Sequence, residues 1–216
     1  MLLCLEDNMV DKKHVIMVSS TVYGIEELLE RVYSLLTSTQ KYDVWMSHKG
    51  TMFTSSDRSA FENCLDSVEK CDLFLGFITP YYGTGKDEEG YSITHREQIK
   101  AISLNKPRWF LVHDHVVFAR SLLNDLGYQG KDGRKKLSFK KECKVLNDLR
   151  VIDMYEDVIQ DQIPLKDRKG NWVQKYLSDD DVLLYAVSQF FRYQEVEDFI
   201  QRNIVNYENL NPKIVK

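Results

Sequence analysis

The sequence has little glycine, proline or cysteine and no long apolar run. Ten glycines and four prolines among 216 residues fall below the roughly 12% that these two residue types average, which disfavours a loop-rich all-β or low-complexity chain. The four cysteines form no C-x-x-C pair, so neither a disulfide framework nor a zinc site is expected. The longest apolar runs, such as residues 109–112, are far shorter than the roughly 20 residues that span a bilayer.

Neither sign of charge dominates. Lysine and arginine total 29, aspartate and glutamate total 33, and the formal net charge is -4. This near-balance removes the electrostatic case for a dedicated binder of nucleic acid or of membrane surfaces. No basic segment leads into an apolar stretch near the first residue, so we expect no signal peptide and a cytoplasmic protein.

Apolar runs and helical periodicity alternate in the first half of the chain. Four short apolar runs are typical of buried strands, and three segments between them carry apolar residues at helical spacing. The strand segments are 14–18, 42–46, 73–78 and 108–113, and the helical segments are 25–37, 61–68 and 94–104. This alternation predicts an α/β fold, a doubly wound parallel sheet in the order 2-1-3-4 with helices on both faces.

The second half predicts a mainly helical extension. We expect residues 1–13 to form a loose leader, residues 14–120 the α/β domain, and residues 121–216 an extension packed on the same domain. Residues 131–150 carry eight basic and three acidic side chains. A solvated helix with a loop is favoured there over a nucleic-acid patch, because aromatic residues are not interleaved.

Three shorter signals lie further along this extension. Trp172 and Val173 follow a turn signal and are expected in a short strand or turn. Ser178 precedes three aspartates and should cap a helix. Apolar residues recur from Val182 to Ile204, which predicts one long C-terminal helix or two consecutive ones.

Polar residues follow three of the four predicted strands. In an open α/β sheet, ligands bind beyond the carboxyl ends of the strands. The segments that follow strands are 19–21, 79–85 and 113–115. The first of these, Ser19-Ser20-Thr21, is either a cradle for ribose or phosphate oxygens or a set of caps for the next helix. Its spacing alone leaves both interpretations open.

Several common site types are disfavoured. The P-loop pattern is absent near Gly83 and Gly85, and no G-x-G-x-x-G follows the first strand, so ATPase, GTPase and ordinary dehydrogenase activities are rejected. His113 and His115 would share one face if the strand extended that far. No third metal ligand accompanies them, so polar packing is favoured and no metal site is predicted.

Glu97 is the strongest catalytic candidate. It lies where a loop becomes a helix, and a carboxylate there would face the same crevice as the Ser19 loop. A structural alternative exists, because Thr94-x-x-Glu97 matches a capping box in which Glu97 only bonds the backbone N–H of Thr94. Position alone does not decide between the two.

A set of motifs in this order resembles an uncharacterised TIR-like domain family. The family is found alone in bacteria and at the N-terminus of larger signalling proteins, and is a remote relative of TIR domains and nucleoside 2-deoxyribosyltransferases. The resemblance covers roughly residues 13–120 and is carried by VIMVSST (15–21), CDLFLG (71–76), YG (82–83), SITHRE (92–97) and KP (106–107), with GNWV (170–173) beyond it.

The resemblance implies a flavodoxin-like sheet and a site for a nucleotide ribose. Glu97 matches the glutamate that acts at the anomeric carbon in the related enzymes. The implied nucleotide-binding residues are Ser19, Ser20, Thr21, Tyr82, Gly83, Ser92, Thr94 and Arg96. His95 and Arg96 beside Glu97 add positive charge that TIR domains need not carry there.

The activity implied is cleavage of the N-glycosidic bond of NAD, by hydrolysis or cyclisation, in bacterial anti-phage defence signalling. NAD would be a substrate and no cofactor is implied; a deoxyribosyltransferase-like reaction is the enzymatic variant. Such cleavage passes through an oxocarbenium-like state that one carboxylate can stabilise. The alternative is a non-catalytic module that senses a nucleotide or binds a protein. Expected partners are a nucleotide and either a second copy or a signalling effector, without nucleic acid or membrane.

Overall fold

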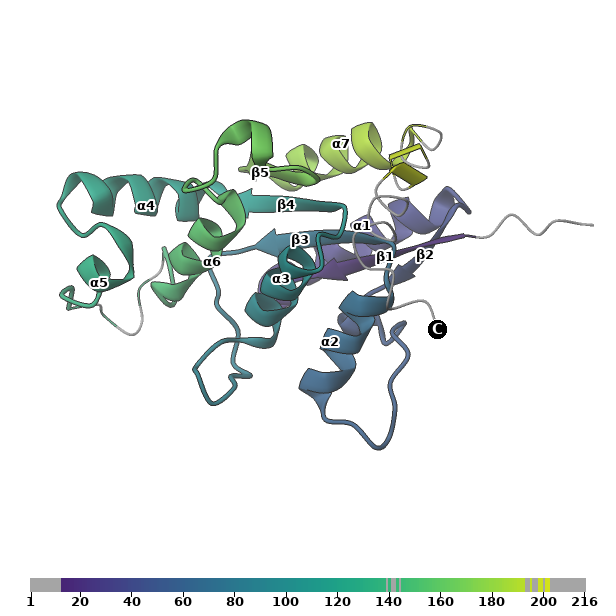
Figure 1. Cartoon of the computed structure of the whole chain (residues 1–216), viewed down its shortest axis with the longest axis horizontal. Coiled ribbons are helices and arrows are strands. Elements are labelled where there is room, and N and C mark those ends of the chain that lie inside the picture. Colours follow the sequence, from purple (N-terminus) through teal and green to yellow (C-terminus); the bar gives the residue numbers. More distant parts are fainter. Residues whose placement is uncertain are drawn as a thin grey trace, which may run out of the picture.

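The structure is a computed structural model that describes residues 13–138, 140, 143, 145–192, 195, 198–199 and 201–202. Most of the predicted leader, and the apolar positions Val196, Ile200 and Ile204 of the predicted C-terminal helix, lie outside the described residues. The elements in chain order (Figure 1) are β1 (His14–Ser19), α1 (Glu26–Ser38), β2 (Tyr42–Trp45), η1 (Ser47–Lys49), α2 (Ala60–Lys70), β3 (Leu73–Ile78), α3 (Ile93–Ser103), β4 (Arg108–His113), α4 (Asp114–Asp125), α5 (Gly130–Arg134), α6 (Arg150–Ile159), η2 (Leu165–Asp167), β5 (Asn171–Tyr176) and α7 (Asp179–Phe190).

The strands form one parallel sheet in the order β2-β1-β3-β4-β5. The doubly wound α/β fold is therefore confirmed, and its first four strands lie in the predicted order. Trp172 and Val173 belong to β5, which pairs along its full length with β4 from Arg108↔Asn171 to His113↔Tyr176. The described part of the chain thus adds a fifth parallel strand at the sheet edge.

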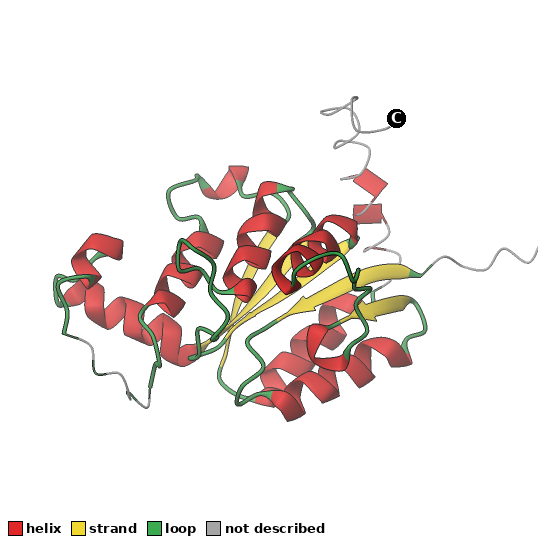
Figure 2. Ribbon diagram, turned by 90° about the horizontal axis from the view of Figure 1, so that it is seen from below, coloured by secondary structure: helices red, strands yellow, loops and turns green. Residues whose placement is uncertain are grey.

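Helices cover both faces of the sheet (Figure 2). Side chains that alternate along β1 explain the two layers, since Ile16 and Val18 face one hydrophobic cluster and Met17 faces the other. Helices α1 and α7 contribute side chains to the first cluster, and helices α2, α3, α4 and α6 contribute side chains to the second. Continuous burial of all six residues of β3 follows from its central place between two covered faces.

Two helices begin at capping boxes, and the one at Ser178 confirms the predicted cap. Ser59 and Glu62 form a capping box at the start of α2, with both reciprocal hydrogen bonds present. Ser178 and Asp181 form the same motif at the start of α7. Both boxes satisfy backbone N–H groups that a helix leaves without partners in its first turn.

The described helices beyond residue 120 pack on helices of the predicted α/β domain. Residue 120 lies inside α4, α6 packs on α3 and α4, and α7 packs on α1. In the basic segment, Arg134 is buried rather than solvated and makes ion pairs with Asp153 and Glu156 of α6. Acidic side chains of α6 are therefore the partners of Arg134 in space.

The described residues contain neither a helix that could span a membrane nor a cluster of side chains that could hold a metal ion. No helix there has the length and apolar character needed to cross a membrane. No group of three or more histidine, cysteine, aspartate or glutamate side chains is placed to hold a metal ion in that part. The strand does not extend to His115, because β4 ends at His113, whose Nδ1 accepts the N–H of His115 and caps α4.

Candidate active site at the carboxyl ends of β1 and β3

Helix α3 begins two residues earlier than its Thr94 signal indicates. Ser92 is the N-cap, and its Oγ accepts the backbone N–H of His95 at 3.2 Å. Thr94 is therefore inside the first turn, and Glu97 lies past it. The capping-box interpretation of Glu97 is wrong, because the residue three positions after the N-cap is His95 and the Glu97 carboxyl points elsewhere.

The Glu97 carboxyl meets the end of β1. The hydroxyl of Ser19 donates a hydrogen bond to Glu97 Oε2 at 2.5 Å, and the thiol of Cys64 from α2 also hydrogen-bonds the carboxyl. Glu97 is only 4% exposed. Three elements thus converge on one buried acid at the edge of the sheet where ligands bind in this type of fold.

Burial sets the chemistry of this carboxyl. It raises the pKa of Glu97 to about 7, although the hydrogen bonds from Ser19 and Cys64 act to lower it. The acid and carboxylate forms therefore coexist near neutral pH. Burial and the neighbouring Glu97 raise the pKa of the Cys64 thiol to about 12, so Cys64 stays protonated and is a donor rather than a nucleophile.

The hydroxyl segment after β1 does not cap the following helix. Helix α1 has Ile25 as its N-cap and no side-chain capping bond, so the capping interpretation of Ser19, Ser20 and Thr21 is wrong. The Ser20 hydroxyl donates to the carbonyl of Thr21 at 2.9 Å. The hydroxyl oxygen of Thr21 is buried and has no hydrogen-bond partner in the described structure.

Two glycines let the loops after β1 and β3 approach each other. Gly83 has φ +91°, and a Cβ there would come within 3.3 Å of the Thr21 hydroxyl oxygen. Gly24 has φ +83°, and a Cβ there would meet the ring of Tyr81 at 3.3 Å. The rings of Tyr23 and Tyr81 pack edge to face with centroids 5.0 Å apart. The loops after β1 and β3 therefore contact each other.

Tyr82 and His95 belong to a buried hydrogen-bonded row. The Tyr82 hydroxyl lies 2.8 Å from Nδ1 of His95, and Nε2 of His95 lies 2.9 Å from Oδ2 of Asp157 on α6. Both aromatic side chains are almost fully buried. Sequence reasoning missed Asp157 because 62 positions separate it from His95 and no local pattern joins them.

Arg96 points to acidic residues of the loop before α3. Its guanidinium forms ion pairs with Asp87 at 2.5 Å and with Glu89 at 2.9 Å, and lies over the ring of Tyr91. The positive charge expected beside Glu97 is therefore balanced by two carboxylates. Thr94 is buried in the first turn of α3.

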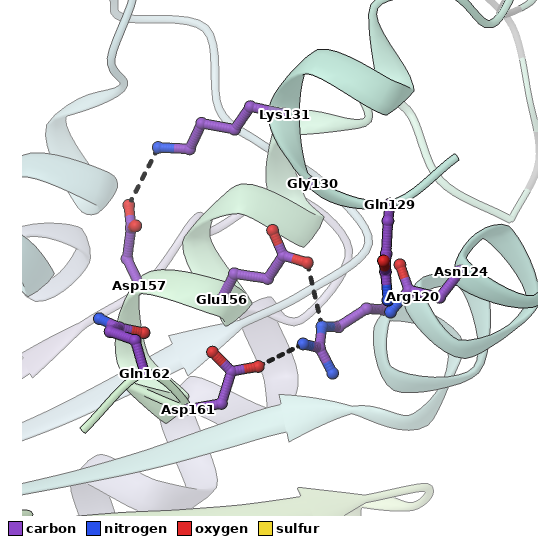
Figure 3. Close-up of a pocket in the computed structure, with 9 residues that line it drawn as sticks. All are labelled: Arg120, Asn124, Gln129, Gly130, Lys131, Glu156, Asp157, Asp161 and Gln162. Carbon is purple, nitrogen blue, oxygen red and sulfur yellow. Dashed lines mark hydrogen bonds and ion pairs between the residues drawn. The ribbon is translucent and has the colours of Figure 1, made fainter. Parts of the chain in front are cut away.

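A polar cavity of about 480 Å³ lies between α4, α5 and α6, apart from the Glu97 site. Figure 3 shows the guanidinium of Arg120 held by Glu156 and Asp161 at 3.1 and 2.6 Å, and Lys131 approaching Asp157 at 3.7 Å. Every cation drawn there faces a carboxylate. The cavity touches the row of hydrogen bonds described above through Asp157.

The fold and the site define a class. The chain is a doubly wound α/β protein whose candidate site, a buried carboxylate and a hydroxyl loop, lies at the switch point between β1 and β3. It belongs to the family described as "Domain of unknown function (DUF4062)", whose sequence profile matches residues 15–168. The TIR-like relationship inferred from the motifs stays a prediction.

Comparisons with individual proteins add little. No curated protein matches the sequence at a significant level. Among solved structures, a CMP N-glycosidase from Clostridium botulinum is similar, with a TM-score of 0.39 and 12% identity over 79% of this chain and 96% of that chain. A similarity of this size carries no inference about activity.

Proposed function

We propose that the protein cleaves the N-glycosidic bond of a nucleotide, with NAD as substrate and Glu97 acting at the anomeric carbon. The observation that carries the proposal is a buried carboxyl with a pKa of about 7, bonded to Ser19 at the end of β1. A structural ion pair would give this acid a cationic partner, whereas its described hydrogen-bond partners are a hydroxyl and a thiol. A carboxylate desolvated in this way favours a cation beside it.

The substrate would supply that cation. The bond between nicotinamide and ribose breaks, its electron pair returns to the ring nitrogen, and positive charge develops on the ribose. The Glu97 carboxylate stabilises this charge, and the Ser19 hydroxyl at 2.5 Å holds the carboxylate in place. A water oxygen then bonds the anomeric carbon and loses its proton; in cyclisation a nitrogen of the same nucleotide takes the place of water.

The hydroxyl loop would bind the rest of the nucleotide. The unpartnered hydroxyl of Thr21 and the backbone around Gly83 line the meeting point of the two loops. Because Glu97 is 4% exposed, the loops after β1 and β3 must separate for a nucleotide to enter. Ser20, Ser92 and Arg96 lie on these loops or at the start of α3, where they would orient ribose or diphosphate.

The burial of Glu97 also suits a second candidate function, that of a non-catalytic binding module. A carboxyl covered to this degree also suits a module that binds a nucleotide or a protein without turning it over. In either case we propose, on the motif resemblance, a role in cytoplasmic anti-phage signalling, as a homo-oligomer or acting on an effector protein.

One experiment separates these functions. The purified protein is incubated with NAD at low and high protein concentration, and the products are resolved by mass spectrometry. Free nicotinamide with linear or cyclic ADP-ribose supports the enzyme. Tight NAD binding without products would support the sensing module, and neither binding nor products would leave a protein-binding role.

A further inference from the structure

Three side chains from separate parts of the chain form one continuous row of hydrogen bonds. Tyr82 comes from the loop after β3, His95 from α3 and Asp157 from α6. The contacts are 2.8 Å from Tyr82 Oη to His95 Nδ1 and 2.9 Å from His95 Nε2 to Asp157 Oδ2. Tyr82 and His95 are each 1% exposed. The row therefore runs through the interior and ends at the polar cavity of Figure 3.

The charge of Asp157 determines that the nitrogen of His95 facing it carries a hydrogen. Burial acts to raise the pKa of Asp157, but the hydrogen bond from His95 and the charge of Lys131 outweigh it and hold that pKa below its usual range. An ionised carboxylate only accepts, so His95 Nε2 carries a hydrogen. Where Nδ1 carries no hydrogen it is the acceptor, and the Tyr82 hydroxyl donates to it at 2.8 Å.

The other end of the row holds the start of α3. The backbone N–H of Ser92 donates to Tyr82 Oη at 3.4 Å, and Ser92 Oγ accepts the backbone N–H of His95. The side chain of Ser92 also lies next to Gly83, where the two site loops meet. The row therefore acts on the residue that begins the helix bearing Glu97.

Asn147, just before α6, and Arg150, its first residue, contact the same loop. Asn147 Oδ1 accepts the backbone N–H of Tyr82 at 2.9 Å, and the backbone N–H of Asn147 donates to the carbonyl of Pro80. The guanidinium of Arg150 lies over the Tyr82 ring and donates to the carbonyl of Gly90 at 2.6 Å. The loop between β3 and α3 is thus held near both of its ends.

We propose that Tyr82, His95 and Asp157 are positioning residues of the Glu97 site. The row sets the loop after β3 and the first turn of α3, and through that turn the place of Glu97. This role rests on the proposed function, since positioning has a catalytic consequence only if Glu97 is catalytic.

The test uses the full chain with Tyr82→Phe, Asp157→Ala and the double variant. Tyr82→Phe keeps the ring under Arg150 and removes only the hydroxyl. The matched control is Tyr91→Phe, because the Tyr91 ring also packs on His95, with centroids 4.9 Å apart, but its hydroxyl is no part of the row. NAD turnover, ¹⁵N spectra of the histidines and amide hydrogen exchange are measured for each protein.

We expect kcat for NAD to fall about tenfold in each single variant with a smaller change in KM, as for a lost positioning hydrogen bond. The double variant should lose no more than the worse single variant, because both break one unit. Wild-type His95 should show hydrogen on Nε2. The Ser92 amide should exchange about tenfold faster in Tyr82→Phe and unchanged in Tyr91→Phe.

Three results would overturn the proposal: full kcat in Tyr82→Phe, additive losses in the double variant, or hydrogen on Nδ1 of wild-type His95. If the wild-type protein shows no turnover, the proposed function fails on its own. The row is then judged by its proton order and by exchange at Ser92, and unchanged exchange in Tyr82→Phe would refute positioning.

Discussion

Ser19 Oγ and Glu97 Oε2 lie 2.5 Å apart although 78 positions separate the two residues in the sequence. The contact joins the end of β1 to the second turn of α3 across the switch point of the sheet. It gives a buried acid a neutral donor instead of a cation.

Glu97→Gln should abolish most NAD turnover without unfolding the protein. The amide keeps the shape of the side chain and an oxygen that can accept from Ser19, but it carries no charge. We expect kcat to fall about a hundredfold or more, as when an electrostatic stabiliser is removed. Product formation by mass spectrometry measures the loss, and a thermal melt monitors the fold. Glu89→Gln, an exposed acid in the preceding loop, serves as the control. Full turnover in a normally melting Glu97→Gln protein would remove this residue and its mechanism.

The raised pKa of Glu97 predicts opposite effects of pH on stability and turnover. Between its ordinary pKa of 4.5 and the folded value of about 7, the folded state binds more protons than the unfolded state, so stability falls as pH rises. The loss is about 3 kcal/mol at most for a shift of this size. Turnover should instead rise through pH 7 as the carboxylate forms.

Urea unfolding of the wild-type protein and of Glu97→Gln from pH 5 to pH 8 measures the first effect. The difference in unfolding free energy between the two proteins should change over this range and level off above it. A constant difference would mean that Glu97 has an ordinary pKa in the folded protein. The pH–rate profile measures the second effect.

Ser19→Ala should shift that pH–rate profile to higher pH. The Ser19 hydrogen bond acts to lower the pKa of Glu97, so its removal leaves less carboxylate at neutral pH. Turnover at pH 7 should fall several-fold and recover in part at pH 8 to 9. Ser20→Ala is the control for the pH shift alone, because the Ser20 hydroxyl bonds the Thr21 carbonyl and not Glu97, so the midpoint of its profile should stay in place whatever its effect on turnover. Identical profiles for both variants would exclude a role of Ser19 in tuning Glu97.

Gly83→Ala should weaken both folding and nucleotide binding. The residue has φ +91°, and the added Cβ would press on the Thr21 hydroxyl at 3.3 Å. We expect a cost of about 1–3 kcal/mol from the backbone conformation and the contact. Gly127→Ala is the control, since Gly127 has φ +87° with nothing within 4 Å of its Cβ position. Equal destabilisation by both variants would mean that only the backbone strain matters.

Arg134→Met should destabilise the region beyond residue 120. Its guanidinium is buried and bonds Asp153 and Glu156 at 2.5 Å each. Removing it leaves two carboxylates partly buried without this partner, which typically costs about 3–5 kcal/mol. Lys135→Met removes an exposed neighbour whose surface pair with Asp132 should add little to stability. Denaturant unfolding of both variants makes the comparison, and similar midpoints would contradict the prediction.

Periodicity and strand position predicted most of the fold and the place of Glu97. Local signals did not locate the first residue of α3. Ser92 and Thr94 are both residue types that cap helices, and only the structure shows that Ser92 is the N-cap. Helix α4 was not predicted, because Phe118, Leu122 and Leu126 are exposed and blur its amphipathic pattern. The partners Cys64 and Asp157 depend on tertiary packing between distant segments, which no local pattern encodes.

The bond between His95 and Asp157 also affects when the site can form during synthesis of the chain. During synthesis a chain emerges from its N-terminus at about 5–20 residues per second, so the 60 residues from Glu97 to Asp157 take roughly 3 to 12 seconds. Over that interval a nascent chain already holds β1, β3 and Glu97 but lacks Asn147, Arg150 and Asp157, which fasten the loop after β3. Glu97 is therefore synthesised before the residues that hold the loop after β3, and the site reaches its final form only when α6 has been made.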